Sequence, residues 1–172
     1  EAEKLKKANQ KVELIKLDIT KEEQILKVIP ILIERFGTID VLVNLVGGYL
    51  GGKSITELGE NDWDTMMRLN LKSAFLISKH VIPVMISGKG GNVVHISSRT
   101  GLKSDGYDSA YAASKAGLIR FVESTSQEFK ENNINVNCIL PTIIDTEANR
   151  RTMPNADFKK WLLKEDLANV IL

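Results

Sequence analysis

Short apolar runs alternate with long helical patterns along this chain, and no other feature constrains its fold as strongly. Apolar runs occur at residues 39–46, 92–97 and 134–140, with helical patterns between them at 62–86 and 109–132. A short, nearly continuous apolar run is typical of a strand that is covered on both faces. Residues 12–17 are expected to form a fourth strand. The alternation predicts one α/β domain over residues 1–172, with a parallel, doubly wound sheet in three layers.

The predicted helix boundaries follow from local signals. A helix is expected to end near residue 9, and short helices joined by loops are expected over residues 145–172. Thr20 and Glu23 have the spacing of a capping box and predict that a helix begins there. Apolar residues recur at helical spacing up to Gly37, which is expected to end that helix. Pro30 lies inside the pattern and is expected to kink the helix or shift its start.

Composition and charge exclude several classes of function. The chain is 43% hydrophobic with a net charge of +1 and no long block of Lys or Arg, so nucleic-acid binding is not expected. No apolar run approaches the roughly 18 residues of a membrane span. Cys138 is the single cysteine, which indicates a reducing, cytoplasmic compartment. His80 and His95 have no cysteine or acidic cluster at ligand spacing, so no metal site is expected.

A Tyr-x-x-x-Lys pattern occurs twice, as Tyr49–Lys53 and as Tyr111–Lys115. Two internal glycines make the first copy a loop, where the spacing fixes no geometry. The second copy lies in helical sequence, where residues four apart share a face. A lysine ammonium there would favour the phenolate and lower the pKa of Tyr111, which could then exchange a proton with a substrate oxygen. A surface tyrosine and lysine on a helix fit the same pattern.

The ends of the predicted strands select the other candidate residues. Ligands of a parallel sheet bind beyond the carboxyl ends of its strands, which places Asp18, residues 44–47, Ser98 and residues 141–142 at the site. Asn70 lies in the middle of a long apolar helix, where Asn is a poor helix former unless its side chain has a task.

Taken together, these residues resemble the catalytic Asn, Ser, Tyr and Lys of the short-chain dehydrogenase/reductase family, a group of Rossmann-type enzymes. The matching residues are Asn70, Ser98, Tyr111 and Lys115. Further family motifs are similar to residues 18–20, 42–47, 63–75, 92–98 and 136–142, together with Thr146. Leu45, Val46 and Thr142 depart from the family's usual residues, but none of these changes removes a catalytic group.

The resemblance implies an NAD- or NADP-dependent oxidoreductase that interconverts a carbonyl and an alcohol on a small molecule. It implies that Tyr111 is the general acid or base, that Ser98 polarises the substrate oxygen, and that Lys115 binds the nicotinamide ribose. Asn70 would hold a water that links Lys115 to solvent. The implied cofactor contacts are Asp18, Ile19, Asn44, Gly47, Tyr111, Lys115, Pro141, Ile144 and Thr146.

One family motif does not occur in the sequence. The Gly-x-x-x-Gly-x-Gly turn that holds the dinucleotide phosphates at a helix N-terminus would precede residue 1. We therefore expect this chain to be a fragment that lacks a first β-α-β unit and a last strand, and to be inactive alone. The residue that chooses between NAD and NADP is expected to lie in the missing unit.

The sequence is compatible with three functions and does not select a substrate. The default is an activity like that of 3-oxoacyl reductases. Residues 149–161 and the glycine-rich loop at 46–52 are similar to dihydropteridine reductase, which is a second possibility. A dinucleotide-binding regulator without turnover is a third. Family members are commonly homotetramers or homodimers, implying assembly through helices 62–86 and 109–132.

Overall fold

A parallel three-stranded sheet forms the centre of the molecule. The computed structural model describes residues 12–172, so the helix expected near residues 1–9 lies outside the described residues. The strands are β1 (Val41–Asn44), β2 (Gly91–Ile96) and β3 (Ile134–Ile139), in the order β1-β2-β3. Both pairings are parallel, so the carboxyl ends of the three strands meet at one edge. The α/β class with a parallel sheet is confirmed.

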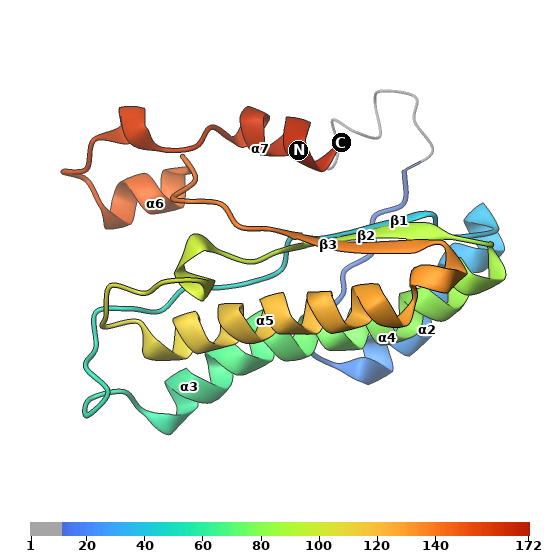
Figure 1. Cartoon of the computed structure of the whole chain (residues 1–172), viewed down its shortest axis with the longest axis horizontal. Coiled ribbons are helices and arrows are strands. Elements are labelled where there is room, and N and C mark those ends of the chain that lie inside the picture. The colour runs from blue at the N-terminus through green and yellow to red at the C-terminus, as the bar shows by residue number, and fades with distance from the viewer. Residues whose placement is uncertain (1–11) are drawn as a thin grey trace.

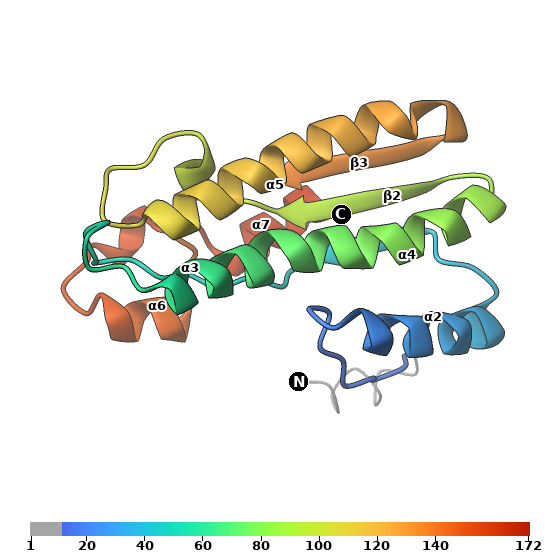
Figure 2. The same ribbon diagram turned by 90° about the horizontal axis from the view of Figure 1, so that it is seen from below.

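The long helices cover one face of this sheet (Figure 1). They are α2 (Glu22–Phe36), α3 (Glu60–Met67), α4 (Ser73–Ser87) and α5 (Ser109–Glu128), and a π-helical turn, Arg68–Lys72, joins α3 to α4. Figure 2, the view from below, shows α5, the α3–α4 helix and α2 side by side in front of the strands. The shorter α6 (Glu147–Thr152) and α7 (Lys164–Ile171) lie on the opposite side of the sheet. Within residues 12–172 there are also three 3₁₀ turns, at Arg99–Gly101, Lys130–Asn132 and Phe158–Lys160.

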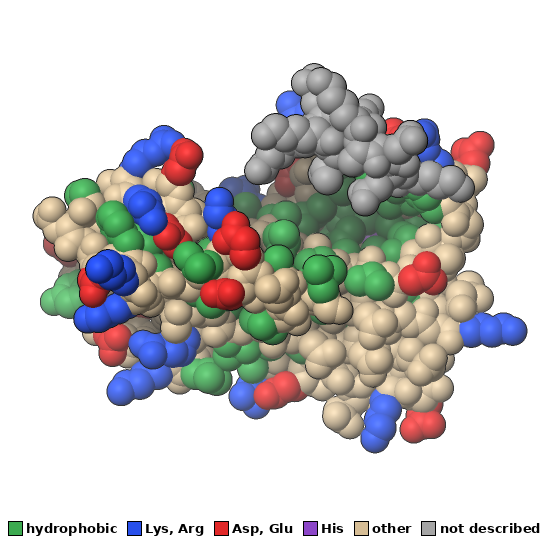
Figure 3. Space-filling view, turned by 90° about the horizontal axis from the view of Figure 1, so that it is seen from above, with side chains coloured by type: hydrophobic (Ala, Val, Ile, Leu, Met, Phe, Trp, Pro, Cys, Tyr) green, Lys and Arg blue, Asp and Glu red, His purple; other side chains and the backbone are tan. Residues whose placement is uncertain are grey.

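The core lies between the sheet and the long helices. Side chains alternate across each strand, so Val93 on β2 and Val136 on β3 point toward the helices and are buried. The helices contribute the other fully or nearly buried apolar residues, including Ile25, Ala74, Val81, Met85 and Leu118. The other face of β1 is open: Val41 and Val43 are 56% and 37% exposed. Figure 3 shows hydrophobic side chains on the floor of the hollow above the sheet.

The expected strand at residues 12–17 does not form, so the described sheet has three strands rather than four. A strand is stable only when a neighbour pairs with its backbone groups, and no ladder joins this segment to β1 among residues 12–172. Leu17 instead packs against the core. A small apolar cavity of about 170 Å³ lies between Leu17, α2, β1 and α4.

The boundaries of α2 correct one local expectation and confirm another. Lys21 occupies the N-cap position without a side-chain cap, and the Thr20 hydroxyl donates to Asp18 Oδ1 at 2.7 Å instead. The capping box is therefore wrong, because the helix begins one residue later than the pattern requires and the Thr20 side chain turns back to Asp18. The helix starts at Glu22 and includes Pro30, so Pro30 does not shift its start, and Gly37 ends the helix with φ +85° as expected.

The helix from Glu60 to Ser87 is 28 residues long and apolar enough to pass for a membrane span by length and composition. Half of the most apolar 18-residue stretch of this helix is buried inside the molecule. It packs along α5 and α2, so within the described fold it acts as a core helix.

Candidate active site

Two hydrogen bonds fix the start of α5 against the carboxyl end of β2, and a third, within α5, braces the turn that carries Tyr111. The Ser97 hydroxyl, which follows β2, donates to the Lys115 carbonyl at 2.9 Å. The Lys115 ammonium donates back to the carbonyl of Ile96 at 2.8 Å. The Ser114 hydroxyl donates to the Tyr111 carbonyl at 2.7 Å. The helical turn that carries Tyr111 and Lys115 is therefore held in a fixed position at the sheet edge.

Asn70 lies at the centre of the π-helical turn and is 1% exposed. Its amide donates to the Gly48 carbonyl at 3.0 Å and to the Ser114 hydroxyl at 2.9 Å, and its Oδ1 accepts from the Gly48 N–H at 2.9 Å. Single π-turns inside α-helices occur frequently at functional sites. This side chain therefore joins the helix, the loop after β1 and α5.

Burial dominates the protonation of Tyr111 and Lys115. It raises the pKa of the Tyr111 phenol, and the neighbouring Ser98 hydroxyl acts in the opposite direction. The Lys115 ammonium lies 5.8 Å from the centre of the Tyr111 ring, and burial lowers its pKa to about 8. The expected lowering of the tyrosine pKa by lysine is therefore not seen in this structure, because desolvation disfavours both charged forms. Tyr111 is a protonated phenol at neutral pH.

The loop after β1 approaches this cluster closely at Gly47. A Cβ at this position would lie 2.9 Å from Asn70 Oδ1 and 3.3 Å from Lys115 Nζ. Only a residue without a side chain leaves this space free beside the two polar groups. Gly47 therefore leaves a small open space beside Asn70 and Lys115 at the carboxyl edge of the sheet.

Asn44, the last residue of β1, forms a hydrogen bond with the backbone of that loop. Its Oδ1 accepts from the Val46 N–H at 3.1 Å, so its amide nitrogen faces His95 Nδ1 at 3.2 Å. An amide nitrogen only donates, so Nδ1 accepts and Nε2–H bonds the Ser78 hydroxyl at 3.0 Å. His95 is fully buried, and burial followed by the charge of Lys115 lowers its pKa to about 4. His95 is therefore a neutral structural link.

The other residues assigned to the cofactor have local structural contacts. Asp18 accepts from the Thr20 N–H and hydroxyl, which lower its pKa, and Ile19 is buried in the core. Pro141 follows β3, Ile144 forms a bridge with Leu162, and the Thr146 hydroxyl caps α6 by accepting from the Asn149 N–H at 3.2 Å. Asn44, Gly47 and Pro141 thus lie at the same strand ends as the Tyr111 cluster.

The sequence predicts that Tyr49, in the first Tyr-x-x-x-Lys copy, lies in a loop without a fixed geometry. The residue does lie in a loop, but its ring packs edge-on against Tyr111, with centroids 4.9 Å apart and planes at 79°. The sequence signal that could have placed Tyr49 at the site is its position after the carboxyl end of a predicted strand, where ligands of a parallel sheet bind. Lys53, the other half of that pattern, pairs with Asp62 at 2.6 Å instead.

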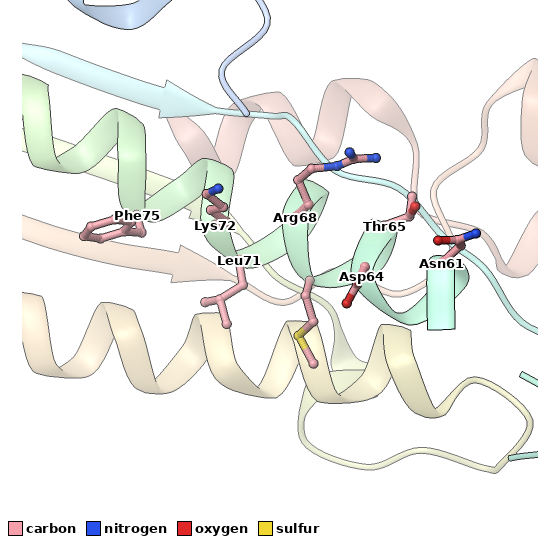
Figure 4. A pocket seen from close by; sticks show the side chains of 8 residues that line it. Asn61, Asp64, Thr65, Arg68, Leu71, Lys72 and Phe75 are labelled. Atoms are coloured by element: carbon pink, nitrogen blue, oxygen red, sulfur yellow. The ribbon is translucent and has the colours of Figure 1, made fainter. Parts of the chain in front are cut away.

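A large groove runs along α3, the π-helical turn and the start of α4, outside this cluster (Figure 4). Leu71 points from the groove toward α5, whereas Arg68 points away from α5. Leu71 lies against Gly117 of α5, where a Cβ would come within 2.9 Å of it. The groove therefore lies on the first of the two helices expected to form an interface, next to the point where Leu71 contacts α5.

Comparisons with known proteins agree with this geometry. A family model described as short chain dehydrogenase matches residues 1–157. The chain is 32% identical to the 3-oxoacyl-[acyl-carrier-protein] reductase FabG of Thermotoga maritima, covering 94% of this chain and 69% of that protein. It is 35% identical to dehydrogenase/reductase SDR family member 6 of Aquarana catesbeiana, covering 88% of this chain and 60% of that protein.

A solved structure, ElxO with NADP bound, superimposes with a TM-score of 0.86 at 28% identity, covering 92% of this chain and 68% of that one. The chain thus spans about two thirds of the length of the relatives it matches. The matched residues contain both the parallel sheet and the Asn70, Ser98, Tyr111 and Lys115 cluster at its carboxyl edge. This chain therefore belongs to the short-chain dehydrogenase family.

Proposed function

We propose that the protein is an NAD- or NADP-dependent oxidoreductase that interconverts a carbonyl and an alcohol on a small molecule. The observation that carries this proposal is the placement of Tyr111 beside Ser98 and Lys115. The Asn70 amide is linked to the same turn of α5, because it donates to the Ser114 hydroxyl, which donates to the Tyr111 carbonyl. The similarity to the 3-oxoacyl-[acyl-carrier-protein] reductase FabG and to ElxO with NADP bound supports it.

The residues at the strand ends fit a nicotinamide dinucleotide. Lys115 is 5% exposed, and among the described residues its ammonium bonds only the Ile96 carbonyl. Two of its three N–H donors are thus available for ribose hydroxyls. Gly47 leaves open space beside it, and Asn44, Pro141, Ile144 and Thr146 lie at or beyond the same edge. Asp18 and Ile19, which precede α2, are proposed to contact the adenine end. When bound, the nicotinamide supplies or accepts the hydride.

The chain's own residues handle the proton. Burial keeps Tyr111 protonated, so in the direction of reduction its phenol gives a proton to the substrate oxygen. The Ser98 hydroxyl holds that oxygen in place. The phenolate left behind is stabilised by the buried cation of Lys115, whose charge is little screened there. Asn70 is proposed to hold a water through which Lys115 exchanges protons with solvent.

Tyr111→Phe in the full-length protein tests the proposal. Turnover is expected to fall by at least about 100-fold, which is typical for loss of a general acid, while cofactor affinity measured by calorimetry stays unchanged. Tyr107→Phe is the matched control, because it removes an exposed phenol from a nearby loop.

Turnover of both variants and of the unchanged protein is measured with several substrates: cyclic and linear ketones, a 3-oxoacyl thioester and quinonoid dihydropterin. Activity retained by Tyr111→Phe would overturn the role of this tyrosine. Cofactor binding without turnover of any substrate would favour a regulator. Turnover of the dihydropterin alone would favour a dihydropteridine-reductase-like enzyme.

We also propose that the protein is a cytoplasmic homodimer or homotetramer that assembles through helices 62–86 and 109–132. The groove along α3 and α4 supports this assembly, because Phe75, which lines it, is 45% exposed. Sedimentation equilibrium of the full-length protein tests the assembly, and a monomer at micromolar concentration would contradict it. The free thiol of Cys138 supports the location.

A further inference from the structure

The loop from Gly47 to Lys53 presents an aromatic side chain beside the proposed proton donor. Tyr49 is 69% exposed, yet its ring contacts Tyr111 with centroids 4.9 Å apart. A single exposed tyrosine needs no explanation in general. This one differs because it borders the reacting group and because its loop is held at both ends.

The loop's hydrogen bonds restrict where Tyr49 can go. On one side, Gly48 exchanges two hydrogen bonds with the buried Asn70 side chain. On the other, the N–H groups of Gly52 and Lys53 both donate to the Tyr107 carbonyl, at 2.8 and 3.3 Å. The Lys53–Asp62 ion pair adds a third anchor. The ring is therefore displayed on a pre-organised segment, which reduces the entropy lost when a ligand binds to it.

Gly51 sets the direction of the ring. A Cβ at Gly51 would lie 2.1 Å from the Tyr49 hydroxyl oxygen and 2.7 Å from the ring carbon that bears it. Gly51 does not have a positive φ, so its backbone conformation does not require glycine. The glycine therefore serves to make room for the tyrosine, which folds back over its own loop.

We propose that Tyr49 forms an aromatic wall of the substrate site and favours substrates whose carbonyl is carried on a flat, aromatic-fused ring over saturated or linear ones. A flat substrate would contact the exposed ring of Tyr49 while its oxygen reaches Tyr111 and Ser98. Aromatic contacts of this kind strengthen binding beyond the area they bury, whereas a saturated ring gains burial alone. The inference rests on the carbonyl-reductase function proposed above and selects among its substrate classes.

Two ketones with the same carbon frame test the wall: 2-tetralone, which has a fused aromatic ring, and 2-decalone, which is saturated. Initial rates of the full-length protein with NADH or NADPH give the ratio of their kcat/KM values. Tyr49→Leu is expected to lower this ratio by about 3- to 10-fold, the usual worth of an aromatic pair. The change should appear as a higher KM for 2-tetralone with little change in kcat.

Three further variants make the result specific. Tyr49→Phe keeps the ring and should keep the ratio. Gly51→Ala retains Tyr49 but displaces its ring, and should lower the ratio as Tyr49→Leu does. Tyr107→Asn removes an equally exposed tyrosine that, among the described residues, pairs with no other ring, and asparagine suits its φ of +60°. This control should leave the ratio unchanged.

The outcomes separate this inference from the proposed function. Turnover of both ketones with a ratio that Tyr49→Leu and Gly51→Ala leave unchanged would overturn the aromatic wall alone. The same holds if Tyr107→Asn lowers the ratio as much as Tyr49→Leu does. Turnover of no carbonyl substrate at all would overturn the proposed function, and the aromatic wall with it.

Discussion

Replacing Asn70 by alanine removes three hydrogen bonds that join the π-helical turn to the rest of the site. They run to the Gly48 N–H, the Gly48 carbonyl and the Ser114 hydroxyl, at 2.9, 3.0 and 2.9 Å. Each contributes about 1 kcal/mol net to stability, giving about 3 kcal/mol for the set. Because Gly48 is only half-buried, water can replace part of this, so the expected loss is about 2–3 kcal/mol.

Urea unfolding of the cofactor-free full-length protein measures this loss, and hydrogen exchange reports the Gly48 amide directly. The amide should exchange faster in Asn70→Ala. Asn70→Asp keeps an acceptor for the Gly48 N–H, so it should protect that amide more than alanine does.

Thr125→Val is the matched control, since it keeps the shape of a buried side chain and removes one hydrogen bond to the Phe121 carbonyl. Its cost should stay within about 1 kcal/mol. Equal losses for Asn70→Ala and Thr125→Val, with unchanged exchange at Gly48, would refute the assignment of Asn70 as the joint between loop and helices.

Two further predictions concern the core. The pKa of His95 falls from 6.5 in the unfolded chain to about 4 in the fold. This shift contributes about 3 kcal/mol to the free energy of unfolding. The contribution is complete above pH 6.5 and is lost as the pH falls toward 4. Urea midpoints between pH 7.5 and 4.5 should therefore fall less steeply for His95→Asn, and identical slopes would contradict a buried neutral imidazole. At Gly91, a Cβ would lie 2.6 Å from Met85 Sδ and 3.1 Å from the Asp40 carbonyl oxygen. Gly91→Ala should cost about 1–3 kcal/mol and Met85→Ala about 2–5 kcal/mol. The double variant should cost clearly less than their sum in urea unfolding, because removing Met85 relieves the clash, and strict additivity would rule out that contact.

The local pattern was sufficient for most of the secondary structure. The strands at 41–44, 91–96 and 134–139 and the long helices between them were predicted, because hydrophobic period directly reflects which side of an element is buried. The π-helical turn around Asn70 was not predicted as such. Its extra residue per turn leaves no mark in composition, although the unusual position of a buried Asn did point to this place.

Residues 12–17 and Thr20 show where local reasoning fails. The apolar run at 12–17 has the composition of a strand, but a strand also needs a neighbour with unpaired backbone groups, and none lies beside it in the described sheet. Thr20 has capping-box spacing, but Lys21 is the N-cap residue of α2, and the Thr20 hydroxyl donates back to Asp18.

The sequence by itself determined the α/β architecture and the identity of Asn70, Ser98, Tyr111 and Lys115 as candidates. Helical spacing and strand ends place such residues at one edge without further information. Only the tertiary structure decided how these groups are held and charged: Ser97 and Ser114 fix α5, burial rather than lysine governs the pKa of Tyr111, and Tyr49 packs against its ring. Desolvation and ring contacts depend on what surrounds a group in space, and residues far apart along the chain supply those surroundings.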